Sequence, residues 1–119
     1  MKTAEEWVKE GNVAYSAKRY DEAIEYFNRA ISLNPCCAET YYSLGHAYRF
    51  SKEDYDKTIK CYRLAIFFNS NYAEAYYSLG EFYGTLGKVK TEKNYLKKAA
   101  KLGSKPAQQW LQSKKILWE

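Results

Sequence analysis

The chain of 119 residues contains only two prolines, six glycines and one histidine, and this scarcity sets the first limits on its structure. Because proline and glycine interrupt helices, their small number permits long ones. The sequence has no run approaching the ~20 apolar residues of a membrane span. Residues 1–7 are charged and lack the apolar core of a signal peptide. We therefore expect a soluble, cytoplasmic protein that does not act at a membrane.

Three cysteines and a single histidine limit the chemistry of any active site. Cys36 and Cys37 are adjacent, which is not the spacing of a zinc knuckle. An odd number of cysteines suits a reducing compartment. His46 is expected to face another side of the fold than Cys61, so no catalytic pair is indicated. We expect no enzyme activity, no metal, no cofactor and no small-molecule substrate.

The composition is that of a folded chain, because 46% of the residues are hydrophobic and 18% aromatic. Such a chain is too apolar for intrinsic disorder. A domain of this length buries roughly two thirds of its unfolded surface, so it does not need disulfides or metals for stability.

An internal repeat organises the sequence. The segment AETYYSLG at residues 38–45 returns as AEAYYSLG at residues 73–80, and a weaker copy occupies residues 4–11. Each copy shows two apolar stripes at i, i+3, i+4 and i+7, which predict two helices. Asn and Pro break the chain between copies, and the second copy has one extra residue in a polar turn at 51–54. The predicted helices are 4–17, 20–33, 38–50, 55–68, 72–86, 89–102 and 106–117.

One glycine recurs in each copy, as Gly11, Gly45 and Gly80. A residue without Cβ lets the second helix of a pair approach the first closely. We therefore expect these glycines to lie where two helices touch.

The recurring positions resemble the tetratricopeptide repeat (TPR) family. They are Trp7, Gly11, Tyr20, Ala23, Phe27, Ala30 and Pro35, then Tyr41, Leu44, Gly45, Tyr48, Tyr55, Tyr62 and Ala65, then Tyr76, Leu79, Gly80, Tyr83, Gly87, Leu96 and Ala99. Residues 95–103 are also similar to the related Sel1-like repeats. The resemblance implies an all-α fold, a right-handed α-solenoid of three antiparallel helix hairpins plus a seventh capping helix. It implies a single domain over residues 1–119, with repeats at about 4–37, 38–72 and 73–104 and the cap at 106–117.

Several positions depart from the family pattern. Glu10 replaces the usual Leu, Thr58 and Glu92 replace a small Ala, and Ser70 and Ser104 replace Pro. Glu92 is the most serious departure, because a carboxylate at a contact between helices should loosen the third hairpin or turn outward.

The last predicted helix resembles the first helix of an unfinished fourth repeat. Ser104 and Pro106 form a good helix start. Lys114 stands where the recurrent glycine would be, and it would block a further helix and keep the end hydrated, as solenoid caps require. Trp118, at the frayed end, could instead form a dimer or partner contact, so we expect a monomer or a weak homodimer.

The resemblance implies that the first helix of each hairpin lines a concave groove for a peptide or helix of a partner protein. The expected groove residues are Asn12, Tyr15, Glu39, Tyr42, His46, Arg49, Phe50, Glu74, Tyr77, Ser78 and Glu81. Stacking the copies gives an apolar row (Val8, Tyr42, Tyr77, Leu111), an acidic row (Glu5, Glu39, Glu74) and a mixed row (Asn12, His46, Glu81, Lys115). The alternative is that these are ordinary solvated residues, with Tyr42 and Tyr77 packing between repeats.

The acidic row favours an apolar or basic partner. One TPR subclass binds acidic chaperone tails through a clamp of Lys, Asn and Arg side chains. Of that clamp only Asn12 is in place, and Val8, Ser43, Glu74 and Ser78 occupy the other sites. An acidic chaperone tail is therefore not the expected ligand.

Charge is uneven along the chain. Residues 1–34 hold five basic and six acidic side chains, whereas residues 88–115 hold nine lysines and one acidic residue, Glu92. A lysine cluster can bind nucleic acid or an anionic surface, so Lys88 to Lys115 offers a second hypothesis. The region lacks arginine and any nucleic-acid motif, which favours a solvated face. A third hypothesis is a self-assembling scaffold.

Overall fold

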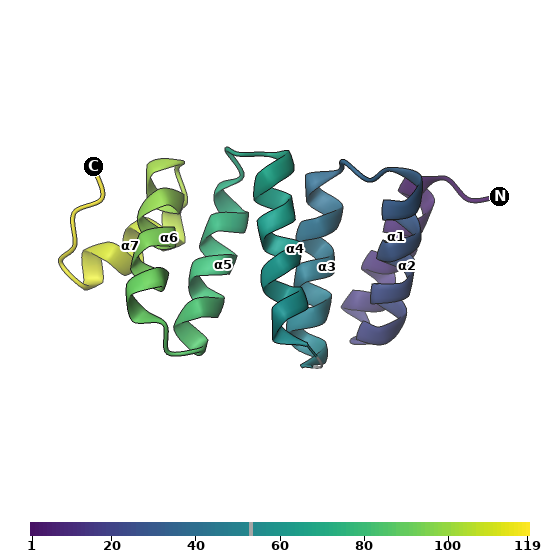
Figure 1. Ribbon diagram of the computed structural model, residues 1–119, viewed down its shortest axis with the longest axis horizontal. Coiled ribbons are helices and arrows are strands. Elements are labelled where there is room, and N and C mark those ends of the chain that lie inside the picture. Colours follow the sequence, from purple (N-terminus) through teal and green to yellow (C-terminus); the bar gives the residue numbers. More distant parts are fainter. Residues whose placement is uncertain (53) are drawn as a thin grey trace. The chain divides into compact units, whose positions relative to one another are not determined.

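Helix-forming segments with short polar connections make up most of the chain, as the computed structural model shows (Figure 1). The structure describes residues 1–52 and 54–119, and within these ranges there are seven helices and no strand. The helices are α1 (Ala4–Ser16), α2 (Tyr20–Leu33), α3 (Ala38–Ser51), α4 (Tyr55–Phe68), α5 (Ala73–Thr85), α6 (Val89–Lys101) and α7 (Lys105–Ser113). The predicted bounds of the first six are confirmed to within one residue. In the described ranges, no helix has the length and apolar character needed to span a bilayer.

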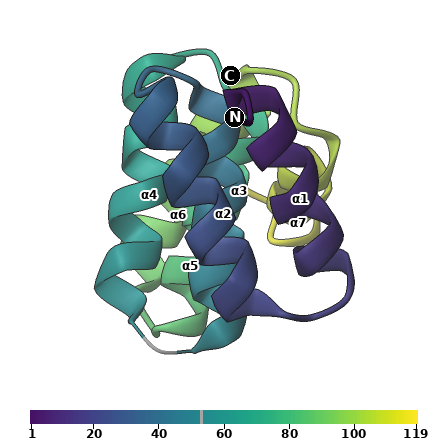
Figure 2. The same ribbon diagram turned by 90° about the vertical axis from the view of Figure 1, so that its right-hand side faces the viewer.

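The helices group into two units, Met1–Phe68 and Asn69–Glu119. In the first unit α1 pairs with α2 and α3 pairs with α4, and α3 also packs against both α2 and α1 (Figures 1 and 2). In the second unit α5 pairs with α6, and α7 packs against α6. The all-α fold of helix hairpins is thus confirmed, whereas a single domain over residues 1–119 stays a prediction. Within the predicted turn at 51–54, Glu53 lies outside the described residues.

The recurrent glycines lie where the two helices of a hairpin touch, as expected, and at Gly11 and Gly45 the contact is with an aromatic ring. A Cβ on Gly11 would lie 2.5 Å from the ring of Phe27, and one on Gly45 would lie 2.7 Å from the ring of Tyr62. Both rings are fully buried. The contact is looser at Gly80, where the nearest atom to such a Cβ is 3.1 Å away.

The departures from the family pattern are accommodated locally. Thr58 is fully buried, and its hydroxyl donates to the backbone carbonyl of Asp54 at 3.4 Å. Glu10 forms an ion pair with Lys2 at the surface. Glu92 remains half-buried rather than turning outward, because its carboxylate lies where a side chain on Gly84 would be. The glycine therefore provides the room that Glu92 takes.

The end of α7 differs from the prediction. The helix begins as expected, with the Ser104 hydroxyl accepting from a backbone amide, but it ends at Ser113 instead of residue 117. Lys115 adopts a left-handed backbone (φ 59°), and the amide of Ile116 donates to the carbonyl of Leu111 at 2.9 Å. The chain therefore reverses, and Ile116 and Trp118 pack against a buried cluster of α6 and α7. Trp118 is thus half-buried in its own unit rather than frayed, because covering this core removes apolar surface from water.

The turn of the first hairpin offers a test of backbone strain. Lys18 is left-handed (φ 62°), whereas Gly87 (φ 78°) holds the equivalent place in the third hairpin. The left-handed conformation costs a non-glycine residue about 1–2 kcal/mol, and glycine loses roughly 0.5–1 kcal/mol more on folding. Lys18→Gly is therefore expected to raise the free energy of unfolding by about 0.5–1 kcal/mol, measured by urea denaturation.

The reverse variant, Gly87→Lys, is the matched control. A Cβ on Gly87 would meet no atom within 4 Å, so only the backbone conformation is tested there. Gly87→Lys should lower the free energy of unfolding by about 0.5–1 kcal/mol. Identical midpoints for both variants and the unmodified chain would show that neither turn is strained.

Candidate functional site

A hollow of about 380 Å³ lies between the N-terminal halves of α1 and α3 in the first unit. Its described lining is Ala4, Glu5, Val8, Lys9, Asn12, Ala30, Asn34, Cys37, Glu39, Thr40 and Ser43. Most of the surface inside is apolar, and Glu5 and Glu39 are both exposed beside it. Cys37 donates a hydrogen bond to a carboxylate oxygen of Glu39 at 3.3 Å. The hollow thus combines an apolar floor with two carboxylates and one cation, Lys9.

An aromatic cluster follows along α1 and α3, with one ring each from α2 and α4. It comprises Tyr15, Tyr20, Tyr42, His46, Phe50 and Tyr62. The ring centroids of Tyr42 and His46 are 4.4 Å apart in an edge-on arrangement, and Tyr15 and Phe50 are each 6.4 Å from His46. Burial raises the pKa of Tyr15 above its ordinary value.

The hollow and the cluster share one face. Tyr15 follows Asn12 by three positions on α1, and His46 follows Ser43 by three positions on α3, which places each pair on one side of its helix. We call the hollow and the aromatic cluster together the first-unit groove.

Tyr62, on α4, contacts the His46 ring. The Tyr62 hydroxyl lies 2.6 Å from Nδ1 of His46, and the ring centroids are 5.4 Å apart. Burial raises the pKa of Tyr62 far above its ordinary value, so the hydroxyl keeps its proton and can donate to the imidazole. The described residues contain no group of three potential ligands that could hold a metal. The contacts with Tyr62 and Tyr42 fix the position of the His46 ring.

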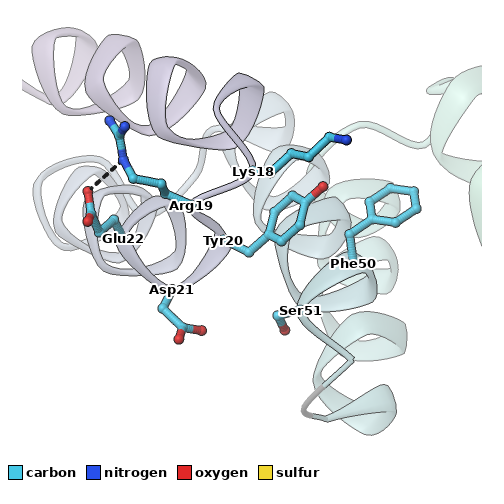
Figure 3. Close-up of a pocket in the computed structure, with 7 residues that line it drawn as sticks. All are labelled: Lys18, Arg19, Tyr20, Asp21, Glu22, Phe50 and Ser51. Carbon is cyan, nitrogen blue, oxygen red and sulfur yellow. Dashed lines mark hydrogen bonds and ion pairs between the residues drawn. The ribbon is translucent and has the colours of Figure 1, made fainter.

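A second hollow of about 380 Å³ lies at the turn between α1 and α2 (Figure 3). Tyr20 and Phe50 lie beside each other there, with ring centroids 6.2 Å apart. Arg19 and Glu22 form an ion pair at 3.1 Å. The remaining described lining is Lys18, Asp21 and Ser51. Its charges are balanced, so it favours no ligand of one sign.

Comparison with protein families identifies this arrangement of hairpins. The TPR repeat family matches residues 11–48 and 49–87, and the tetratricopeptide repeat family matches residues 73–103. The chain belongs to the tetratricopeptide repeat family. The matches include the third copy, whose residues 95–103 are also similar to Sel1-like repeats.

Several solved structures, two of them named as TPR domains, are similar to this chain. MamA is 32% identical with a TM-score of 0.81, and the alignment covers 89% of this chain and 61% of MamA. The Sgt2 TPR domain from Aspergillus fumigatus is 24% identical (TM-score 0.83), with 94% and 76% covered. The first TPR of Spaghetti (RPAP3), bound to the HSP90 peptide SRMEEVD, is 22% identical (TM-score 0.84), with 93% and 89% covered. The chain spans about three fifths of MamA. No curated protein matches the sequence significantly.

Seven of the predicted groove residues come together in the first unit. Asn12 and Glu39 line the hollow, and Tyr15, Tyr42, His46 and Phe50 belong to the aromatic cluster. Arg49 is half-buried, with its guanidinium 5.5 Å from the centre of the Phe50 ring. Phe50 is 43% exposed, so part of its ring is open to a ligand.

The four predicted groove residues of the second unit differ from one another. Glu74 and Glu81 are exposed. The Tyr77 hydroxyl donates to Glu81 at 3.3 Å, and the Tyr77 ring packs against the cluster formed by α6 and α7. Ser78 is only 4% exposed, so it is a buried residue rather than a surface one. Leu111, placed in the apolar row, is fully buried in the same cluster.

Other residues of the groove were not selected from the sequence. Tyr62 is one of the recurring family positions, and spacing alone does not show that its hydroxyl meets His46. Thr40 and Cys37 also line the hollow. Cys37 directly precedes α3, and Thr40 lies one turn before Ser43. These positions in the sequence indicate that both residues share the face of Ser43.

The three cysteines are free and differ in exposure. Cys36 is exposed, Cys37 is half-buried, and burial raises the pKa of Cys61 to about 12. Because the thiolate is the reactive form, Cys61 should react with Ellman's reagent at mildly alkaline pH at least about a hundredfold more slowly than Cys36.

The measurement compares the Cys36→Ser, Cys37→Ser variant, which keeps only Cys61, with the Cys37→Ser, Cys61→Ala variant, which keeps only Cys36. For the variant that keeps only Cys61, little colour should develop in buffer, and one thiol should react once urea unfolds the chain. Rapid reaction in buffer would place Cys61 at the surface.

Proposed function

We propose that this TPR chain is a protein-interaction module whose first-unit groove holds an extended or helical segment of a partner protein. The observation that carries the proposal is the hollow between α1 and α3, which is apolar inside and continues along the same face to a partly exposed aromatic cluster. Tyrosine and phenylalanine rings suit such a role, because they offer large contact area at little entropic cost. The structure of Spaghetti with a bound peptide supports this use of the fold.

The expected ligand carries apolar side chains together with Lys or Arg. Glu5 and Glu39 stand beside the hollow, and only Lys9 opposes them there among the described lining residues. The peptide bound to Spaghetti is acidic at its end. In this chain the hollow presents Val8 and Ser43 at two of the clamp positions and two carboxylates nearby. An acidic tail would be repelled, so a basic or neutral segment is favoured.

The proposed module has no enzyme activity of its own and works as an adaptor in the cytoplasm, with both units in one domain. The three free cysteines support a reducing compartment. Burial raises the pKa of the Cys61 thiol to about 12, which makes it a poor nucleophile and supports a binding role.

The test begins with peptides selected from a random display library on the intact chain. Selected peptides should be enriched in apolar and basic residues. Their affinity should fall at least about tenfold for the Glu5→Lys, Glu39→Lys double variant, because it replaces two attractive charges by two repulsive ones. Charge reversal is a cleaner test than removal of Tyr42. The Tyr42 ring packs against His46, so its removal would also disturb the position of the His46 ring.

The matched control is the Glu25→Lys, Asp56→Lys double variant. Both residues are exposed, neither lines the hollow, and the change in net charge is the same. Affinity should change by less than about twofold after correction for overall charge. Equal losses in the two variants would show that binding depends on net charge and not on the groove.

A further inference from the structure

The second unit contains a hollow of its own, of about 610 Å³, between the start of α6 and the end of α7. Three apolar side chains line it, Val89, Trp110 and Ile116, together with three lysines, Lys90, Lys93 and Lys114. Most of the surface inside is apolar. The wall formed by Ile116 exists because the chain reverses after α7.

The apolar part of this hollow is open to solvent. Val89 is 68% exposed although it is the first residue of α6, and Trp110 and Ile116 are half-buried. Exposed apolar surface ringed by charge is typical of an interaction site. The second unit therefore has an apolar surface that its own residues do not cover.

The charge around the hollow is mostly positive. Glu92 is the single acidic residue in its described lining, and its carboxylate is directed to the contact with Gly84. Lys90 and Lys114 are exposed, and Lys93 is half-buried. A ligand with carboxylates around an apolar centre would match both features, because each lysine would gain a partner and Val89 would be covered.

We propose that this hollow is a second protein-docking surface, which takes a segment carrying apolar side chains flanked by Asp or Glu. It differs from the first-unit groove, whose expected ligand is basic. Nucleic acid fits less well: the Trp110 ring, which could stack on a base, has the Lys114 ammonium 5.7 Å from its centre. A phosphate backbone would also leave Val89 uncovered.

The experiment titrates the intact chain with a short helical peptide that has two leucines one turn apart and glutamates around them. Two control peptides replace the leucines by serine or the glutamates by lysine. An oligonucleotide and vesicles of anionic phospholipid are titrated in parallel. The leucine–glutamate peptide should bind at least about tenfold more tightly than either control peptide.

Two variants with matched controls locate the surface. Lys90→Glu with Lys93→Glu should weaken binding of the leucine–glutamate peptide at least about tenfold. Lys101→Glu with Lys105→Glu, which changes the same charge on the same unit outside the hollow, should have an effect below about threefold. Val89→Asp should weaken binding about fivefold or more, and an acidic first residue suits a helix N-terminus, so folding is retained. Val13→Asp, at an exposed position of α1, is its control.

Three outcomes would overturn the proposal. The leucine–glutamate peptide could fail to bind. The serine peptide, the oligonucleotide or the vesicles could bind as tightly, which would make the region a general anion-binding surface. Val89→Asp could also leave the affinity of the peptide unchanged. That result would show that the peptide does not bind in the hollow.

Discussion

Replacing Tyr62 by alanine is expected to lower the free energy of unfolding by about 3–5 kcal/mol, as for other large buried aromatic side chains. The ring is fully buried, it lies against the backbone of Gly45, and its hydroxyl meets His46 at 2.6 Å. Alanine would leave a cavity at the centre of the first unit and remove the support of the groove. Urea denaturation followed by circular dichroism gives the change in unfolding free energy.

Two further variants separate the parts of this effect. Tyr62→Phe keeps the ring and removes only the hydroxyl, so it should cost about 0.5–1.5 kcal/mol. Phe67→Ala, on the same helix but 77% exposed, should stay within about 0.5 kcal/mol of the unmodified chain. If Tyr62→Ala cost no more than Phe67→Ala, the ring would not be part of the core.

Gly45→Ala is expected to lower the free energy of unfolding by up to about 2 kcal/mol. A new Cβ would lie 2.7 Å from the Tyr62 ring, and overpacking of this kind costs about 1–3 kcal/mol. Alanine regains roughly 1 kcal/mol of helix propensity. Gly80→Ala is the matched control: its nearest neighbour would be 3.1 Å away, so the two effects should nearly cancel. The measurement is again urea denaturation.

The sign of the Gly45→Ala effect should reverse when the ring is removed. In a Tyr62→Ala background the clash is absent, and the added methyl group brings only its helix propensity, about 1 kcal/mol of stabilisation. The double variant should therefore be more stable than Tyr62→Ala alone. Additive effects would show that Gly45 is required for a reason other than the approach of Tyr62.

The sequence predicts the helices well because the repeat supplies several independent signals for each one. The apolar stripes, the recurrent Gly11, Gly45 and Gly80, and the Asn-rich breaks all point to the same bounds. The end of α7 is different, since no later copy fixes the register there. Helical spacing continues to residue 117, yet Ile116 and Trp118 are better buried by turning back onto α6 and α7.

Side-chain geometry within the site follows less directly from the sequence. Helical periodicity places Tyr15, Tyr42 and His46 on the groove face, and the structure brings them together. It does not reveal that the Tyr62 hydroxyl holds His46, because that contact joins two helices. Glu92 shows the same limit, since its tolerance depends on the missing side chain at Gly84 in the facing helix.

The charge pattern could be predicted only in part. The acidic positions Glu5 and Glu39 do meet at one hollow, because α1 and α3 are neighbours. The lysine-rich end suggested an anionic partner, but its apolar centre arises where Val89 meets Trp110 and Ile116 from a later segment of the sequence. The number of lysines in the sequence does not predict that they surround an apolar hollow.

The most direct test of groove binding is a titration of the selected peptide followed through the imidazole signal of His46 by nuclear magnetic resonance. The chain has one histidine, so the signal has a single source. The expected result is a saturable shift of that signal with the dissociation constant found for the whole chain, lost in the Glu5→Lys, Glu39→Lys variant. A peptide that binds with full affinity while the His46 signal stays unchanged would contradict binding in the first-unit groove.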